Sequence, residues 1–109
     1  FELGSHAPVA DETEVPVDQP VDLYFSAMPD PDSASRRTML LTSGQVQYTG
    51  SFRVALLDRR LRYQPARALP PHLGLRVHIF AGLRGLDGHE LAEKLELGFM
   101  TGSGVSANS

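Results

Sequence analysis

The stretch VDLYFSA, residues 21–27, has the alternation of apolar and polar side chains that decides the fold class. In an extended chain successive side chains point to opposite faces, so Val21, Leu23 and Phe25 share one face. Asp22 falls on the other face. We therefore predict a half-buried β-strand here, with its apolar face turned toward a core.

Six other segments have the character of strands. RLRYQP (60–65), LRVHIFAG (75–82) and KLELGFMT (94–101) repeat the alternation, and TMLLTS (38–43), QVQY (45–48) and SFRVALL (51–57) are weaker candidates. A bend is expected at Thr49-Gly50, and a tight hairpin at Asp58-Arg59. Eight prolines and ten glycines leave little room for long helices. The pattern predicts an all-β fold, an antiparallel β-sandwich of six to eight strands.

The length and composition are those of one soluble domain. The 109 residues are 41% hydrophobic and include no cysteine, which excludes disulfides, thiolate metal sites and a cysteine nucleophile. We expect residues 1–7 to be a leader or an addition to the natural domain, residues 8–102 to be the sandwich, and residues 103–109 to be a flexible linker or tail. The absence of a starting Met indicates a processed product or a module of a longer protein.

Charge is segregated along the chain although the net charge is only −3. Residues 1–32 contain eight acids and no Lys or Arg, whereas residues 33–84 contain nine Arg and one Asp. A nucleic-acid-binding domain is expected to be basic overall, and this chain has a pI near 5.7. We instead expect acidic and basic strands to lie side by side and form cross-strand ion pairs.

Two short motifs resemble chemical sites. In GLRGLDGHEL (82–91), His89 and Glu90 begin like a zinc-binding HExxH helix, but the fifth position is Glu93. We interpret this stretch as a turn. Asp30 and Asp32 in PDPDS are spaced for a shared cation, and a weak calcium site near them stays open at this point, although capping of a helical turn at Pro31 is the favoured reading.

Other candidate residues lack the partners that a catalytic or metal site needs. His78 is predicted on the outer face of its strand, and His72 in a proline-rich turn. The serines, among them Ser43 and Ser51, are not in a nucleophile motif. HELAEKL (89–95) is the only other candidate for a short helix. We predict no catalytic, cofactor-binding or metal-binding residues and no cofactor, so the chain is not expected to be an enzyme.

Three phrases, taken together, resemble one known family. They are ADETEVPVDQPVDLYFSAMPDPDS (10–33), RLRYQPARALPPHLGLRVHI (60–79) and GLRGLDGHELAEKLELGFMTG (82–102). In order and spacing they are similar to the bacterial Ig-like domain of the surface-layer-protein (SbsA) type. The resemblance covers Pro8 to Gly102 and departs from the family pattern at Leu75, Gly85 and His89. It implies an all-β fold, an antiparallel Ig-like β-sandwich of about seven strands, as a module of secreted or cell-envelope bacterial proteins.

These observations lead to two functional hypotheses. The first is a non-catalytic spacer or interaction domain, extracellular or in the bacterial cell envelope, whose partners are neighbouring domains of a longer protein. The alternative is an adhesion module that binds carbohydrate or another surface protein. It would use an exposed apolar patch of Tyr24, Phe80 and Met100, which fall opposite the aliphatic stripes. Neither hypothesis involves nucleic acid or insertion into a membrane.

Overall fold

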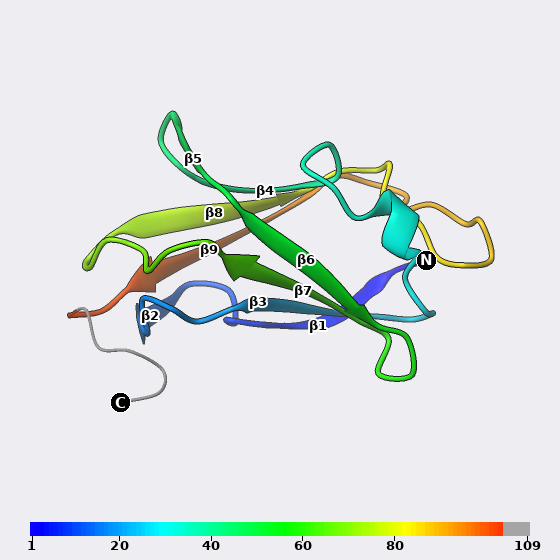
Figure 1. Ribbon diagram of the computed structural model, residues 1–109, viewed down its shortest axis with the longest axis horizontal. Coiled ribbons are helices and arrows are strands. Elements are labelled where there is room, and N and C mark those ends of the chain that lie inside the picture. Colours follow the sequence, from blue (N-terminus) through cyan, green and yellow to red (C-terminus); the bar gives the residue numbers. More distant parts are fainter. Residues whose placement is uncertain (104–109) are drawn as a thin grey trace.

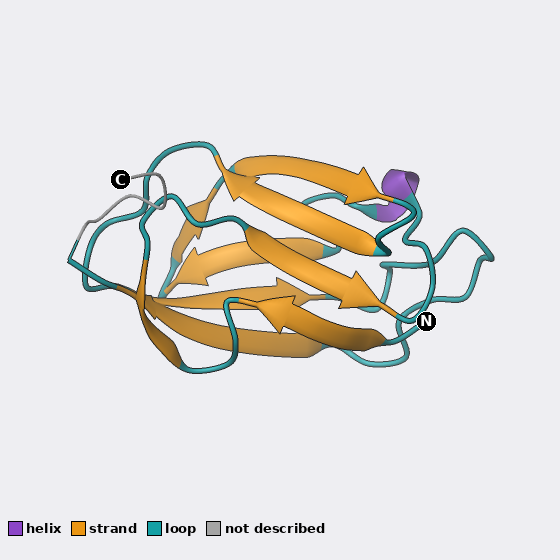
Figure 2. Cartoon of the chain, turned by 90° about the horizontal axis from the view of Figure 1, so that it is seen from below, coloured by secondary structure: helices purple, strands orange, loops and turns teal. Residues whose placement is uncertain are grey.

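The computed structural model describes residues 1–103 and shows two β-sheets packed face to face (Figures 1 and 2). One 3-10 turn, η1 (Pro31–Ser33), lies at one end of the sandwich. The strands are β1 (Leu3–Ala7), β2 (Glu12–Val15), β3 (Val21–Phe25), β4 (Met39–Ser43), β5 (Val46–Tyr48), β6 (Gly50–Ala55), β7 (Arg60–Pro65), β8 (Gly74–Ile79) and β9 (Leu95–Thr101). The predicted all-β sandwich is therefore confirmed.

The two sheets have four and five strands. Their orders are β1-β3-β7-β6 and β2-β9-β8-β4-β5. All neighbouring strands are antiparallel, as expected, except β2 and β9. These two strands are parallel, which the sequence did not predict. The seven segments expected as strands all form strands. Two more, β1 and β2, precede them, which raises the count from about seven to nine.

The core lies between the sheets and is built from the predicted faces. Alternate residues of the central strands point inward, including Leu23 of β3, Leu61 of β7 and Ile79 of β8, which have no exposed surface. Arg62 and Asp22 illustrate the opposite face, where neighbouring strands pair polar residues. The buried apolar cluster comprises Val15, Val21, Leu23, Phe25, Met39, Leu41, Leu61, Tyr63, Leu69, Leu75, Val77, Ile79, Leu83, Leu91 and Phe99.

The N-terminal segment belongs to the sandwich, which corrects the expected boundary at residue 8. Residues 3–7 form β1, and β1 pairs with β3 along its length. The ring of Phe1 stacks on the ring of Phe25, with centroids 4.5 Å apart. These contacts close the edge of the four-stranded sheet, so the domain begins before residue 8. Of the expected tail, residues 104–109 lie outside the described residues.

Local turn predictions were accurate at two places and wrong at one. A bend was expected at Thr49-Gly50, and the chain crosses there from the five-stranded to the four-stranded sheet, between β5 and β6. The β6–β7 hairpin forms too, but with a loop of residues 56–59 in which Arg59 has φ 54°. Residues 89–95 form no helix. Leu91 is instead buried, and its N–H donates to the carbonyl of Leu83 at 2.8 Å.

Candidate functional site

A groove of about 750 Å³ lies on the outer face of the five-stranded sheet. Its floor is the outward side of β8 and β9, and its wall is formed by residues 10–13, where the chain enters β2. Gly98 lies in the middle of β9 opposite Arg76, and because it has no side chain the sheet is hollow there. The N–H of Asp11 donates to the carbonyl of Gly98 at 2.7 Å, which holds the loop against the strand.

A polar cluster centred on Glu96 lies along this groove. The carboxylate of Glu96 contacts Arg76 at 3.2 Å, Nδ1 of His78 at 3.3 Å and Nζ of Lys94 at 3.4 Å. The other ring nitrogen of His78, Nε2, is 2.9 Å from Oγ1 of Thr42. Three strands therefore contribute to one hydrogen-bonded chain, because register places His78 opposite Glu96.

The order hydroxyl, imidazole, carboxylate resembles a nucleophilic triad, but Glu96 and the strand that holds Thr42 have other partners. The charge of Glu96 is shared with Arg76 and Lys94, so it is not reserved for His78. Thr42 lies in a strand that is paired on both sides, with Gln47 and with Arg76. The backbone there is paired with neighbouring strands on both sides, so it does not form the pair of free N–H groups that stabilises an oxyanion.

Glu96 should titrate at an abnormally low pH. The hydrogen bond from Lys94 contributes most to lowering the pKa of Glu96, and charges on Lys94 and His78 add to it. A lowered pKa means that the favourable interaction is present above the ordinary pKa of Glu and is lost as pH falls through the folded-state value. We expect Lys94→Gln to move the pKa of Glu96 back toward that of a free Glu, as measured by carboxyl-detected NMR titration.

Lys94→Arg is the matched control, because it keeps the positive charge. It should leave the low pKa of Glu96 in place. An equal rise in the pKa of Glu96 for both variants would contradict the role given to the charge on residue 94.

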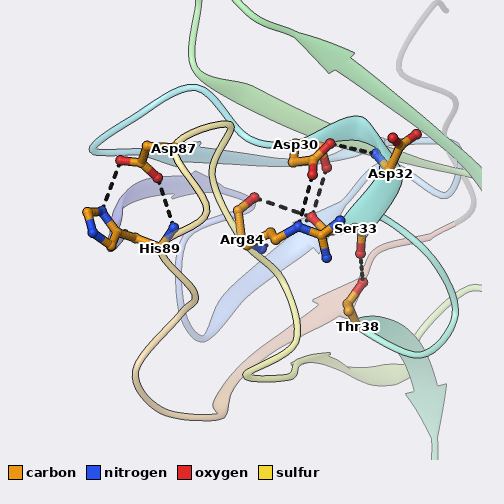
Figure 3. A network of polar contacts seen from close by, with 7 residues as sticks. All are labelled: Asp30, Asp32, Ser33, Thr38, Arg84, Asp87 and His89. Carbon is orange, nitrogen blue, oxygen red and sulfur yellow. Dashed lines mark hydrogen bonds and ion pairs between the residues drawn. The ribbon is translucent and has the colours of Figure 1, made fainter.

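Asp30 acts as the cap that its position predicts. Its Oδ1 accepts a hydrogen bond from the N–H of Asp32 at 3.0 Å, and its Oδ2 pairs with Nε of Arg84 at 2.9 Å. Figure 3 shows these contacts together with Ser33, whose hydroxyl donates to the carbonyl of Asp30 at 2.8 Å. One carboxylate oxygen of Asp30 thus caps η1, and the other joins η1 to the connection between β8 and β9.

The stretch GLRGLDGHEL is a turn, as interpreted from its glycines. The N–H of Gly85 donates to the carbonyl of His89 at 2.9 Å, and Gly88 has φ 87°, which only glycine adopts readily. Asp87 accepts from the N–H of His89 at 3.0 Å and pairs with its ring (Figure 3). The backbone hydrogen bond from His89 is the main cause that lowers the pKa of Asp87. Within residues 1–103 no three His, Asp or Glu side chains converge on a possible metal site.

The expected apolar patch does not exist as one surface. Tyr24 belongs to β3 of the four-stranded sheet, whereas Phe80 and Met100 lie on the five-stranded sheet, so they face opposite ways. Phe80 packs on His78 and under Lys94. Met100 lies opposite Gly74, at the far end of β8 from Phe80. Strand alternation placed each residue on an outer face correctly, but the order of strands separates them.

Charge segregation did predict the cross-strand pairs. Asp22 and Arg62 pair between β3 and β7, and Arg76 and Glu96 pair between β8 and β9. The groove itself was missed, because it depends on which strands are neighbours. Its available signal was the outward position of Arg76, His78 and Glu96 in two segments, together with the glycine at position 98.

Comparison with protein-family models and with curated proteins finds no match to this sequence. Solved structures do share its fold. L,D-transpeptidase 1 of Mycobacterium tuberculosis superposes with a TM-score of 0.62 at 24% identity over 92% of this chain and 38% of that one. An L,D-transpeptidase of Mycobacterium smegmatis gives 0.65 at 20% identity over 93% and 39%. The N-terminal part of the bacterial S-layer protein SbsC gives 0.67 at 14% identity over 92% and 23%.

The chain therefore spans less than two-fifths of the length of these structures. What it shares with them is the β-sandwich, a fold that occurs within bacterial surface-layer and transpeptidase chains. In residues 1–103 there is no helix with the length and apolar character required to span a bilayer.

Proposed function

We propose that this chain is a non-catalytic Ig-like module of a bacterial envelope or secreted protein, where it acts as a spacer or an interaction domain. The observation that carries the proposal is the match of nearly the whole chain to a minor part of longer bacterial chains. A unit that recurs inside such chains folds as a domain and positions what lies beside it. Neighbouring domains of a longer protein are the proposed partners.

The shape suits a spacer. The sandwich measures 41 × 28 × 22 Å, and Figures 1 and 2 show the start of the chain and the end of β9 at opposite ends of the long axis. Domains joined at those two points would be held apart by the length of the module. Strands hydrogen-bonded along their length and packed on a buried core make such a unit stiff.

The adhesion alternative loses its original surface, because Tyr24 lies on a different sheet from Phe80 and Met100. Binding by this chain would need another face. The groove beside Glu96 is one such face, and the outer face of the four-stranded sheet is a second.

The proposed function is tested by measuring whether this module is exposed outside the cytoplasmic membrane. The chain has no cysteine, and Leu57 is 92% exposed at the tip of the β6–β7 hairpin, so Leu57→Cys introduces a single accessible thiol. We expect a membrane-impermeant maleimide to label the longer protein carrying Leu57→Cys in intact cells or in wall-digested cells. The same protein without the substitution is the control. Labelling only after lysis would refute the envelope placement.

A further inference from the structure

The outer face of the four-stranded sheet gathers positive charge. Register places Arg53 of β6 directly opposite Arg62 of β7, and Arg62 opposite Asp22 of β3. In the next row Arg60 of β7 lies opposite Tyr24 of β3. Residues 60 and 62 are two apart on one strand and so point to the same face. Three guanidinium groups therefore share this face, and Asp22 is the only acidic residue in these two rows of described residues.

One of the three arginines shows how this surface binds an anion. Arg62 donates from Nε to Oδ1 of Asp22 at 2.7 Å and from Nη2 to Oδ2 at 2.9 Å. These two parallel bonds are the bidentate geometry by which arginine recognises carboxylates and phosphates. Asp22 is buried, and Arg62 is its only ion-pair partner among the described residues.

The other two arginines have no anion within residues 1–103. Arg53 is exposed and has neither a hydrogen bond nor an ion pair to any described residue, although like charges directly opposite each other, as with Arg62, are unfavourable. Nε of Arg60 is buried and lacks a hydrogen-bond partner among the described residues. Arg53 and Arg60 thus leave positive charge on this surface that a bound anion would neutralise.

The neighbours of these arginines indicate what kind of anion fits. Ser51 and Gln64 form the row beside Arg53 and Arg62, and Tyr24 offers a half-buried ring and a hydroxyl. A sugar stacks on an aromatic ring and exchanges hydrogen bonds with hydroxyl and amide groups. The only aliphatic side chains in the two arginine rows are Ala7 and Ala55, so these rows offer little apolar surface to a protein partner.

We propose that the outer face of the four-stranded sheet binds an acidic glycan, with its carboxylate or phosphate groups on Arg53 and Arg60 and a sugar ring against Tyr24. The open, strand-lined surface suits an extended polymer, which can lie along β7. The proposed binding of an acidic glycan depends on these residues alone. Only the source of the glycan, an envelope polymer, rests on the proposed function, so failure of maleimide labelling and failure of glycan binding are separate outcomes.

The test is titration of the chain with a defined oligogalacturonate at low salt, followed by amide NMR and calorimetry. We expect shifts on β3, β6 and β7, and Kd about tenfold weaker for Arg53→Gln, as for the loss of one charged hydrogen-bonding group. Arg37→Gln is the matched control, because Arg37 is exposed in the loop before β4 and the charge change is identical. It should weaken binding less than about twofold, the size of a nonspecific screening effect.

Four results would overturn the proposal. They are equal weakening by Arg53→Gln and Arg37→Gln, equal binding of the methyl-esterified oligomer, tighter binding of an oligothymidylate of matched charge, or shifts confined to the groove on β8 and β9. Arg53 has no side-chain hydrogen bond or ion pair to any of residues 1–103 and lies opposite Arg62, so Arg53→Gln should keep the thermal midpoint. Lost binding in that variant would then report on recognition and not on unfolding.

Discussion

Gly50→Ala is expected to destabilise the protein by about 3 kcal/mol, the upper part of the range for overpacked sites. A Cβ atom at Gly50 would lie 2.2 Å from the carbonyl oxygen of Gln64 and 2.8 Å from Cζ of Tyr63. The first obstacle is the backbone of a paired strand, which cannot rotate away as a side chain can. Denaturation by urea, followed by far-ultraviolet circular dichroism, measures the loss.

The clash would also disturb a buried hydroxyl. Tyr63 donates a hydrogen bond from its hydroxyl to the carbonyl of Tyr48, at the point where the chain leaves β5 for β6. Burial raises the pKa of Tyr63, so its neutral, donating form is favoured in the folded protein. Pushing the ring away from Gly50 would leave the carbonyl of Tyr48 without this donor. The connection between the two sheets would then lose the hydrogen bond from Tyr63 that holds it in place.

Gly74→Ala is the matched control for this substitution. Gly74 also lies in a strand, but nothing is within 4 Å of the position that its Cβ would occupy, and its φ is not in the left-handed region. We expect no loss, or a gain of about 0.4–1 kcal/mol from the smaller entropy of the unfolded chain. A similar loss for Gly50→Ala and Gly74→Ala would contradict the steric explanation.

The fold was predictable where alternation is regular and neighbours in sequence are neighbours in space. Val21, Leu23 and Phe25 alternate without interruption, and all three are buried. The β6–β7 hairpin also follows from two adjacent strand patterns. Its turn was less predictable, because Arg59 adopts a positive φ that the residue type does not indicate.

Elements that depend on distant partners were missed. β2 (Glu12–Val15) is short and polar, and it becomes a strand only by pairing in parallel with β9, more than eighty residues later. Residues 89–95 have helical propensity, but a bridge between Glu90 and Arg84 and the burial of Leu91 keep them out of a helix. Tertiary contacts decide both cases against local preference.

The groove and the arginine-rich face depend on strand order in the same way. Alternation assigns His78 and Glu96 to outer faces, but only the pairing of β8 with β9 brings them together. Likewise, β6 lies beside β7 at the edge of the four-stranded sheet, and this pairing brings together Arg53, Arg60 and Arg62. Strand order also separates Tyr24 from Phe80, because the strands that carry them belong to different sheets. Side-chain direction is a local property, whereas the composition of a sheet surface is a topological one.

Leu61→Ala should cost about 3–4 kcal/mol, within the range for deleting a buried leucine side chain. Leu61 has no exposed surface and lies in β7 between Leu23 of β3 and Val54 of β6. The strands on both sides are hydrogen-bonded to β7, so the backbone cannot collapse to fill the cavity. Such a loss is a large fraction of the roughly 5–15 kcal/mol by which domains are stable. The urea midpoint of Leu61→Ala against the parent protein measures it.

Leu57→Ala makes the same chemical change four positions earlier in the same hairpin. Leu57 is 92% exposed, so its truncation should alter stability by less than about 0.5 kcal/mol. The pair therefore separates burial from the identity of the residue removed. A cost for Leu57→Ala approaching that of Leu61→Ala would mean that the hairpin tip is covered in solution, and a dependence of that cost on protein concentration would identify a second copy as the cover.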